Sequence, residues 1–397
     1  MTELYFLSRD LSVTAGPIDN YVSLVWEERY DVCGAFTLVV PMDRAVFEAA
    51  LSSSYLEVRG RGGLGRVEKV TFTGGEAGGT VTMSGRMAES LLADRIIPRG
   101  TAVSGPICAA AEAVVSANAC GMSNPRAIPC LCVRSAEPLE DDDGTPILIE
   151  DRPGGTQLDE WLYKVLGAVG ASYRIVPDFD AGALVFEVYR GLDRTQTQDE
   201  NGFAVFSASF SSAGEFDFLS DGTDYRNYAF IAGEGEGEER VTVTLDLRTD
   251  PGEPLRELYV DARDLRSDDG VNPLSPQAYR ELLLSRGRQR LSSHAQITRV
   301  SGTAAAYTEE EVQDAVPSWG NAPVPIGGRF SSSMICGVHY ALGDLCDIAS
   351  ETLGMVWSER VTAVTYIYEG SRVRVEPRFG NAYPDLRTFI RTSAAEV

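Results

Sequence analysis

Two stretches of seven residues, near opposite ends of the chain, share one pattern: Arg66-Val67-Glu68-Lys69-Val70-Thr71-Phe72 and Arg360-Val361-Thr362-Ala363-Val364-Thr365-Tyr366. Both read Arg-Val-x-x-Val-Thr-aromatic, and their alternation of apolar and polar residues is typical of a half-buried β-strand. This pair of matching strands is the most informative feature of the sequence, because it indicates an internal repeat.

The flanking residues extend the match. Each copy is followed by a glycine-containing turn and a second alternating strand, with Val81 and Met83 in one and Val373 and Val375 in the other. The second strands end at Gly85 and Gly380, and short strands at residues 56–58 and 345–348 precede the two copies. We therefore predict a duplicated hairpin. The alternative is that any two valine-rich hairpins look alike.

A real repeat implies a mainly β fold with α+β parts, in which two related small β-barrel domains flank an α+β module. The second barrel would contain a polar, partly helical insertion. The predicted division is 1–98 for the first barrel, 99–195 for the α+β module, 196–250 and 326–397 for the second barrel, and 251–325 for the insertion.

Helix signals fall in a few places. The clearest helix has Thr156 as its predicted cap, an apolar face that includes Leu158, Trp161 and Leu162, and Gly170 as its stop. A hairpin over 172–176 and 184–189 follows it. Further helices are predicted after Asp43, over 86–95, from Pro106 to Ala119, and from the cap Ser275 to about His294.

Composition excludes several classes of protein. The 397 residues are 44% apolar and 23% charged, which is ordinary for a globular protein. Asp and Glu outnumber Lys and Arg by 58 to 35, for a net charge of −23, so the chain repels phosphate backbones and is not expected to grip DNA or RNA. The charge is compatible with DNA sliding past, and equally with a protein that never meets nucleic acid.

The cysteines and the apolar runs of the sequence indicate in which cellular compartment the protein is expected. The seven cysteines are odd in number and lie mostly among apolar residues, which favours reduced thiols in a protein assembled in the cytoplasm. The N-terminus lacks the basic start and apolar core of a signal peptide. No apolar run reaches ~18 residues, so no membrane-spanning segment is predicted.

Catalytic chemistry has few candidates. Only His294 and His339 exist, the first predicted at a helix end and the second in a strand, and no G-x-S-x-G motif occurs. Cys130-x-Cys132 has the wrong spacing and no partner pair for zinc. We therefore predict no catalytic, cofactor-binding or metal site and expect a non-enzymatic protein. Carboxylate pairs for glycoside hydrolysis are left open, because their separation in space is not readable from sequence.

Two polar loops need an explanation. Gly233-Glu234-Gly235-Glu236-Gly237 imitates a phosphate-binding loop only superficially, since its glutamates oppose phosphate and a strand follows it. A bulged strand or a close backbone approach between subunits explains its glycines better. Asp141-Asp142-Asp143-Gly144 lacks the EF-hand spacing for calcium and is predicted to be a solvated turn.

Three segments of the sequence resemble a known protein family, and they occur in the same order along the chain as in that family. They are Trp26-Glu27-Glu28-Arg29-Tyr30 through Gly34-Ala35-Phe36-Thr37-Leu38 with the Gly85-Arg86 to Arg95-Ile96-Ile97 run; Asn227-Tyr228-Ala229-Phe230-Ile231-Ala232-Gly233 through Arg240; and Tyr340-Ala341-Leu342-Gly343-Asp344 through Arg360-Val361 to Pro377-Arg378-Phe379-Gly380. The sequence resembles siphophage tail hub proteins. That group also forms the hub domain of many tail-associated lysins and is akin to the baseplate hub of contractile-tailed phages.

The resemblance implies a homotrimer at the distal tail tip of a virion, assembled in the bacterial cytoplasm. Two barrels in each of three chains would give a pseudo-sixfold ring that closes the tail tube and opens for DNA. Its implied partners are the distal tail protein ring, the C-terminus of the tape-measure protein, a tip or fibre protein, and DNA that passes without specific binding. Acidic residues facing the channel would keep that DNA from adhering.

One departure and two alternatives accompany this interpretation. The chain stops soon after Gly380, whereas many relatives carry a lytic or receptor-binding extension, so those activities are expected in other chains. The alternatives are a glycan-binding or glycan-hydrolysing β protein, and the hub of a tailocin or contractile injection particle.

Overall fold

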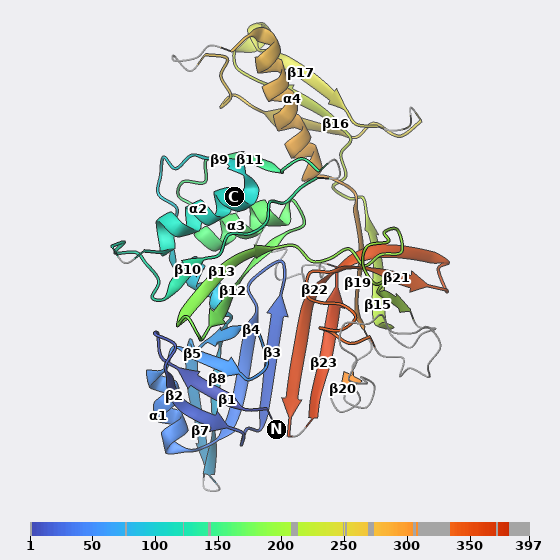
Figure 1. The fold of residues 1–397 in the computed structure, drawn as a ribbon. Coiled ribbons are helices and arrows are strands. Elements are labelled where there is room, and N and C mark those ends of the chain that lie inside the picture. Colours follow the sequence, from blue (N-terminus) through green and yellow to red (C-terminus); the bar gives the residue numbers. More distant parts are fainter. Residues whose placement is uncertain are drawn as a thin grey trace. The chain divides into compact units, whose positions relative to one another are not determined.

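Strands dominate the computed structural model, and four α-helices occur among the residues that it describes (Figure 1). Those residues are 2–75, 78–121, 123–141, 144–207, 213–248, 250, 252–268, 274–304, 307–308, 334–370 and 372–380. The prediction of a mainly β fold is confirmed. No closed barrel is found in this part of the chain, so the two-barrel arrangement stays a prediction.

Internal contacts divide the chain into two units. Unit 1 comprises Met1–Phe216 and Ser301–Val397, and unit 2 comprises Asp217–Val300. The finer four-part division inferred from the sequence stays a prediction. Each unit has a hydrophobic core of its own.

The largest sheet joins strands from both ends of the chain. Its spatial order is β15 (Ala213–Asp221), β19 (Ile297–Ala304), β23 (Arg372–Phe379), β22 (Met355–Glu369), β3 (Ser23–Arg29), β4 (Ala35–Pro41), β8 (Gly78–Arg86) and β7 (Lys69–Gly75), with β14 (Val205–Ser207), β20 (Tyr307–Thr308) and β21 (Leu345–Ser350) paired off this path. Both hairpins of the predicted repeat, β7–β8 and β22–β23, therefore lie in one sheet.

The two copies of the repeat match in register as well as in sequence. Arg66 lies opposite Tyr55 of the preceding short strand, and Arg360 lies opposite Leu345 of its own preceding strand. The next residue donates its N–H one position further back in both copies, from Val67 to the Ser54 carbonyl (3.0 Å) and from Val361 to the Asp344 carbonyl (2.9 Å). The sequence repeat is therefore also a structural repeat.

The repeat extends to whole halves of the sheet. The order β3-β4-β8-β7 recurs as β15-β19-β23-β22, with the strands of each half in the same sequence order, and the halves meet where β22 pairs with β3. In this scheme unit 2 is inserted between β15 and β19, at the place where residues 30–34 connect β3 to β4 in the first half.

One predicted strand is divided in two. Residues 65–73 were expected to form a single strand, but β6 (Leu64–Arg66) and β7 are separated at Val67 and Glu68. The break occurs where the chain changes partner, because β6 pairs with β5 (Tyr55–Val58) and β7 pairs with β8. In β22 the same change of partner takes place within one continuous strand. β6 and β5 belong to a second sheet with β1 (Leu4–Leu7) and β2 (Val13–Ile18).

The remaining part of unit 1 is an α+β module. It contains the sheet β10-β13-β12, the pair β9–β11, and the helices, with bounds β9 (Val103–Pro106), α2 (Ile107–Ala119), β10 (Leu131–Val133), β11 (Leu148–Asp151), α3 (Leu158–Gly167), β12 (Ser172–Asp178) and β13 (Ala183–Tyr189). The predicted apolar face of α3 is buried and the predicted 172–189 hairpin is present. The predicted cap Thr156 is wrong, since Gln157 takes that position and makes no side-chain cap bond.

Two short helices precede this module. Asp43 caps α1 (Arg44–Ser52) as predicted, by accepting the N–H groups of Ala45 (2.8 Å) and Val46 (3.0 Å). The helix expected over 86–95 is a 3-10 helix, η1 (Ala88–Asp94), and Pro106 is the cap of α2 instead of its first residue.

Unit 2 is a three-stranded sheet with one helix packed on it. The sheet order is β17 (Thr242–Asp246), β16 (Tyr228–Ala232) and β18 (Glu257–Asp261), with η2 (Gly237–Glu239) in the β16–β17 connection. Helix α4 (Pro276–Ser292) begins at the predicted cap Ser275, and it lies along β16 and β17 in Figure 1. Its Tyr279 and Leu283 complete a core with Ile231 and Val243.

Candidate functional site

The large sheet has one buried and one open face. Leu24 and Trp26 of β3 point into the core, and Val25 between them is exposed. Phe72 of β7 belongs to the core-facing row, because it pairs with the buried Val81, yet it is 50% exposed. Its counterpart in the repeat, Tyr366, is only 6% exposed, because Trp26 lies opposite it on the adjoining strand. Phe72 is therefore exposed because β7 is the last strand of the sheet.

The open face between β23 and β7 is mostly polar, although Val25, Val39 and Ile367 also lie on it. Strand register places on it the basic residues Arg29, Lys69, Arg86, Arg372, Arg374 and Arg378 and the acidic residues Glu27, Glu369 and Glu376. Hydroxyl groups from Thr37, Thr82 and Ser84 lie between these charges. The strand residues of this face thus include more basic than acidic groups, and two of the arginines are paired with carboxylates from the adjoining loops, Arg86 with Glu68 at 2.7 Å and Arg29 with Asp31 at 3.8 Å.

Residues 340–344, which belong to the family resemblance, pass very close to the backbone at Gly191. A Cβ on Gly191 would lie 2.0 Å from the Gly343 carbonyl carbon, and a Cβ on Gly343 would lie 2.3 Å from the ring of Tyr30. Gly343 also has φ of +93°, a region that disfavours other residues. Only glycine fits at these two positions.

A buried ion pair stabilises the contact between the backbones at Gly191 and Gly343. The Asp344 carboxylate accepts the N–H groups of Leu192 (2.8 Å) and Ala341 (2.8 Å) and the Nε–H of Arg194 (2.6 Å). Asp344 is almost fully buried and Arg194 largely so. Sequence reasoning missed this network, because 150 residues separate its two charges.

A desolvated carboxyl group lies where η1 meets the α+β module. Glu89 accepts the N–H of Ile175 from β12 at 3.1 Å, and burial raises its pKa to about 7. Glu28 of β3 adds to this rise, and burial raises the pKa of Glu28 as well. Other titratable groups that interact with these two carboxyl groups include Cys33, Arg61, Tyr163, Tyr173, Arg174 and Tyr189.

The raised pKa of Glu89 makes stability depend on pH. The folded state holds a proton on Glu89 that the unfolded state has released, so the free energy of unfolding falls as pH rises from about 4.5 to about 7. Glu89→Gln should remove this pH dependence. The variant's free energy of unfolding should exceed that of the natural chain by about 3 kcal/mol at pH 8 and by little at pH 4.5. Chemical denaturation at both values measures it. The exposed Glu48→Gln serves as control, and an unchanged pH dependence in Glu89→Gln would contradict the assignment.

The two histidines lie apart from any catalytic grouping in the described residues. His294 follows the end of α4, and its carbonyl accepts the Arg226 N–H at 2.9 Å. His339 is in a turn between Cys336 and Tyr340, so its predicted strand position is wrong. Its Nδ1 accepts the Ile335 N–H at 2.9 Å, and burial lowers the pKa of the ring.

Cysteines and carboxylates form no recognisable metal site among the residues that the structure describes. All seven cysteines are free thiols, including Cys130 and Cys132, and no metal-binding group of His, Cys, Asp and Glu occurs in the described part of the chain. Asp141 and Gly144 form a turn, and Asp142 and Asp143 lie outside the described residues. Within the described residues, no helix combines the length and apolarity needed to cross a membrane.

The glycine-rich stretch 233–237 connects β16 to β17. A Cβ on Gly233 would lie 2.6 Å from the Tyr279 hydroxyl of α4, so this glycine permits a close approach within the chain. The close backbone approach between subunits stays a prediction. The expected bulge is a turn, since Gly235 and Gly237 have φ of +98° and +57°.

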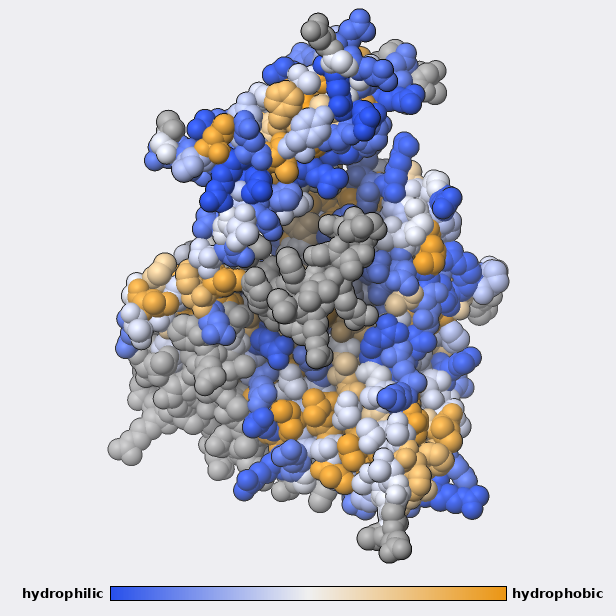
Figure 2. Space-filling view, turned by 180° about the vertical axis from the view of Figure 1, so that it is seen from behind, coloured by the Kyte–Doolittle hydropathy of each residue, from blue (hydrophilic) through white to orange (hydrophobic). Residues whose placement is uncertain are grey.

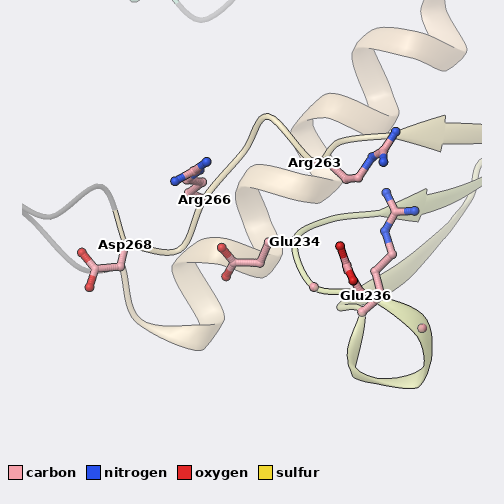
Figure 3. A pocket seen from close by; sticks show the side chains of 8 residues that line it. Glu234, Glu236, Arg263, Arg266 and Asp268 are labelled. Carbon is pink, nitrogen blue, oxygen red and sulfur yellow. The ribbon is translucent and has the colours of Figure 1, made fainter.

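A pocket of about 620 Å³ lies beside this turn in unit 2. Figure 3 shows Glu234 at its centre, Glu236 and Arg263 to one side, and Arg266 and Asp268 to the other. With Arg240, which also lines it, the pocket holds three carboxylates and three guanidinium groups. Such a balanced set suits a polar, uncharged ligand better than a phosphate or a metal ion.

Comparison with known protein families shows which family this chain belongs to. The family model of the Siphovirus ReqiPepy6 Gp37-like proteins matches residues 3–381. This chain belongs to that family. The resemblance to siphophage tail proteins inferred from the sequence is thereby confirmed.

Solved structures of tail proteins share the fold of this Gp37-like chain. The tail protein from Neisseria meningitidis MC58 has 11% identity and a TM-score of 0.52, with 96% of each chain covered. The prophage MuSo2 43 kDa tail protein from Shewanella oneidensis has 13% identity and a TM-score of 0.50, with 95% of this chain and 98% of the other covered. At such identities the likeness shows the fold alone. Curated protein sequences give no significant match.

Proposed function

We propose that this tail protein is a non-enzymatic hub at the distal tip of the tail, where three copies form a closed ring. The observation that carries the proposal is the tandem repeat of four-stranded halves, β3-β4-β8-β7 and β15-β19-β23-β22. Within one chain the second half pairs with the first through β22 and β3. The equivalent junction between chains would join the free edge of β7 to β15 of the next copy.

Such edge pairing repeats the same interface at every step. A head-to-tail interface closes into a ring when its rotation divides a full turn, and three chains would present six similar halves. The arrangement also covers β7, because an exposed edge strand is otherwise a template for aggregation. The two related barrels inferred from the sequence would correspond to the two halves.

The partners follow from the family resemblance. We propose that the ring lies between the distal tail protein ring and a tip or fibre protein, contacts the C-terminus of the tape-measure protein, and opens to pass DNA. The open face of the sheet would line the passage. Its surplus of basic over acidic groups gives no support to an acidic channel wall, and its hydroxyl groups would offer DNA weak, sequence-independent contacts.

Imaging of the purified chain tests the ring. Negative-stain micrographs with mass measured in parallel, for the chain alone and mixed with tail-tip extract, should show threefold rings with a central channel. A chain that stays monomeric and never enters a ring, even with the extract, would refute the proposal. Sheath genes beside this one would place the same hub in a contractile particle.

A further inference from the structure

The sheet of unit 2 has an open face on which strand register places Tyr228, Phe230 and Tyr259. Helix α4 covers the opposite face through Tyr279 and Leu283. On the open face Phe230 of β16 lies directly opposite Tyr259 of β18, and the two side chains are 43% and 60% exposed. Their ring centroids are 6.4 Å apart and the ring planes differ by 16°. The two nearly parallel rings therefore form one aromatic platform.

Paired charges surround this platform. Arg240 donates to the Tyr259 hydroxyl (2.9 Å) and to Asp261 (2.7 Å), and Asp261 also accepts from Arg263 (2.7 Å). On the other side, Asp246 at the end of β17 pairs with Arg248 at 2.8 Å. With Glu257, the face carries three basic and three acidic groups, and the Thr244 hydroxyl lies opposite Phe230.

The polar frame is fixed before any ligand arrives. The Arg240 Nε–H and Nη2–H groups bond the carbonyls of Gly233 and Ala232, both at 2.9 Å, which holds the guanidinium at the edge of the sheet. Arg240 and Arg263 also line the 620 Å³ pocket, so the charged frame of the platform and the pocket share these two residues. A preorganised site of this kind binds at a lower entropic cost.

These features together select the ligand class. Aromatic rings offer an apolar face to the C–H side of a pyranose, and guanidinium–carboxylate pairs can both donate to and accept from sugar hydroxyl groups. Equal numbers of opposite charges disfavour polyanions and polycations alike. We propose that this face of unit 2 binds a short, neutral saccharide across Phe230 and Tyr259, with Arg240 and Asp261 bonding its hydroxyl groups.

A protein partner fits this face less well. Stable protein interfaces bury ~800 Å² on each partner around an apolar core. Here the platform consists of two rings between threonines and charged groups. On the side of unit 2 that Figure 2 shows at its top, apolar side chains form only small groups within a hydrophilic surface.

Titration of the full chain with chitotetraose and with maltotetraose tests the proposal, with heparin and polylysine as charged probes. Ligand-observed NMR should show saturable binding of at least one neutral probe. Phe230→Ala and Tyr259→Ala should each weaken it about tenfold, and Tyr259→Phe, which keeps the ring, about threefold. The matched control is Phe203→Ala, which removes a 57% exposed ring from unit 1 and should change nothing.

Several outcomes would overturn the proposal. They are no saturable binding of either neutral probe, binding of the charged polymers alone, or an equal loss in Phe203→Ala. Thermal unfolding of each variant separates lost binding from lost folding, and Tyr259→Phe keeps the test valid if an alanine variant unfolds. The inference goes beyond the hub role and needs no ring, since a monomeric chain carries the whole face.

Discussion

Phe72→Glu chains should remain monomeric at concentrations at which the natural chain forms threefold rings. Tyr366, the counterpart of Phe72, is buried because the junction of β22 with β3 places Trp26 opposite it. The proposed junction of β7 with the next chain would bury Phe72 in the same way. Burial of a phenylalanine side chain stabilises by about 1.5–3 kcal/mol, so its loss weakens each interface roughly ten- to a hundredfold. The buried carboxylate adds a further penalty.

Light scattering and negative-stain imaging measure this effect, with tail-tip extract added where the chain alone gives no rings. Phe203→Glu is the matched control, because it places the same charge on a comparably exposed ring outside the strands. Unfolding curves should be nearly the same for both variants. Rings formed equally well by Phe72→Glu would exclude β7 as the subunit edge, even if the protein is a hub.

Asp344→Ala should lower the free energy of unfolding of unit 1 by about 3–5 kcal/mol, because it leaves the Arg194 guanidinium buried without its counter-ion. Two backbone N–H groups would lose their acceptor as well. The shift of the denaturant midpoint, followed by tryptophan fluorescence, measures the loss. Glu48→Ala breaks the exposed Arg44–Glu48 pair and should cost less than about 1 kcal/mol.

A second variant separates charge from packing. Arg194→Met combined with Asp344→Ala removes both charges and should recover part of the stability that Asp344→Ala loses. The assignment would be wrong if Asp344→Ala were as mild as Glu48→Ala. It would also be wrong if the double variant lost more unfolding free energy than the two single variants lose together.

Local patterns were predictable from the sequence, and pairings over long distances were not. Alternation identified β7 and β22, and apolar spacing identified the buried face of α3, because both depend on neighbouring residues. Apolar and polar residues also alternate over 241–247, which is typical of a strand, but the alternation does not indicate that this strand, β17, pairs with β16 in unit 2.

The candidate sites were less accessible for the same reason. Gly191 and Gly343 show their purpose only when two distant backbones cross. Phe230 and Tyr259 become a platform only through the parallel pairing of β16 with β18. Glu89 is an ordinary glutamate in sequence, and its raised pKa comes from the burial that folding imposes.

The position of unit 2 between β15 and β19 has a consequence for how such chains diversify. Its two ends continue into strands of one hairpin, and in the first half of the sheet a five-residue turn makes the equivalent connection. An insertion attached in this way can be lost, lengthened or exchanged as a cassette, while the strand pairing on which assembly depends stays the same. Selection can then remodel the chemistry of the insertion in each lineage without disturbing the architecture that carries it.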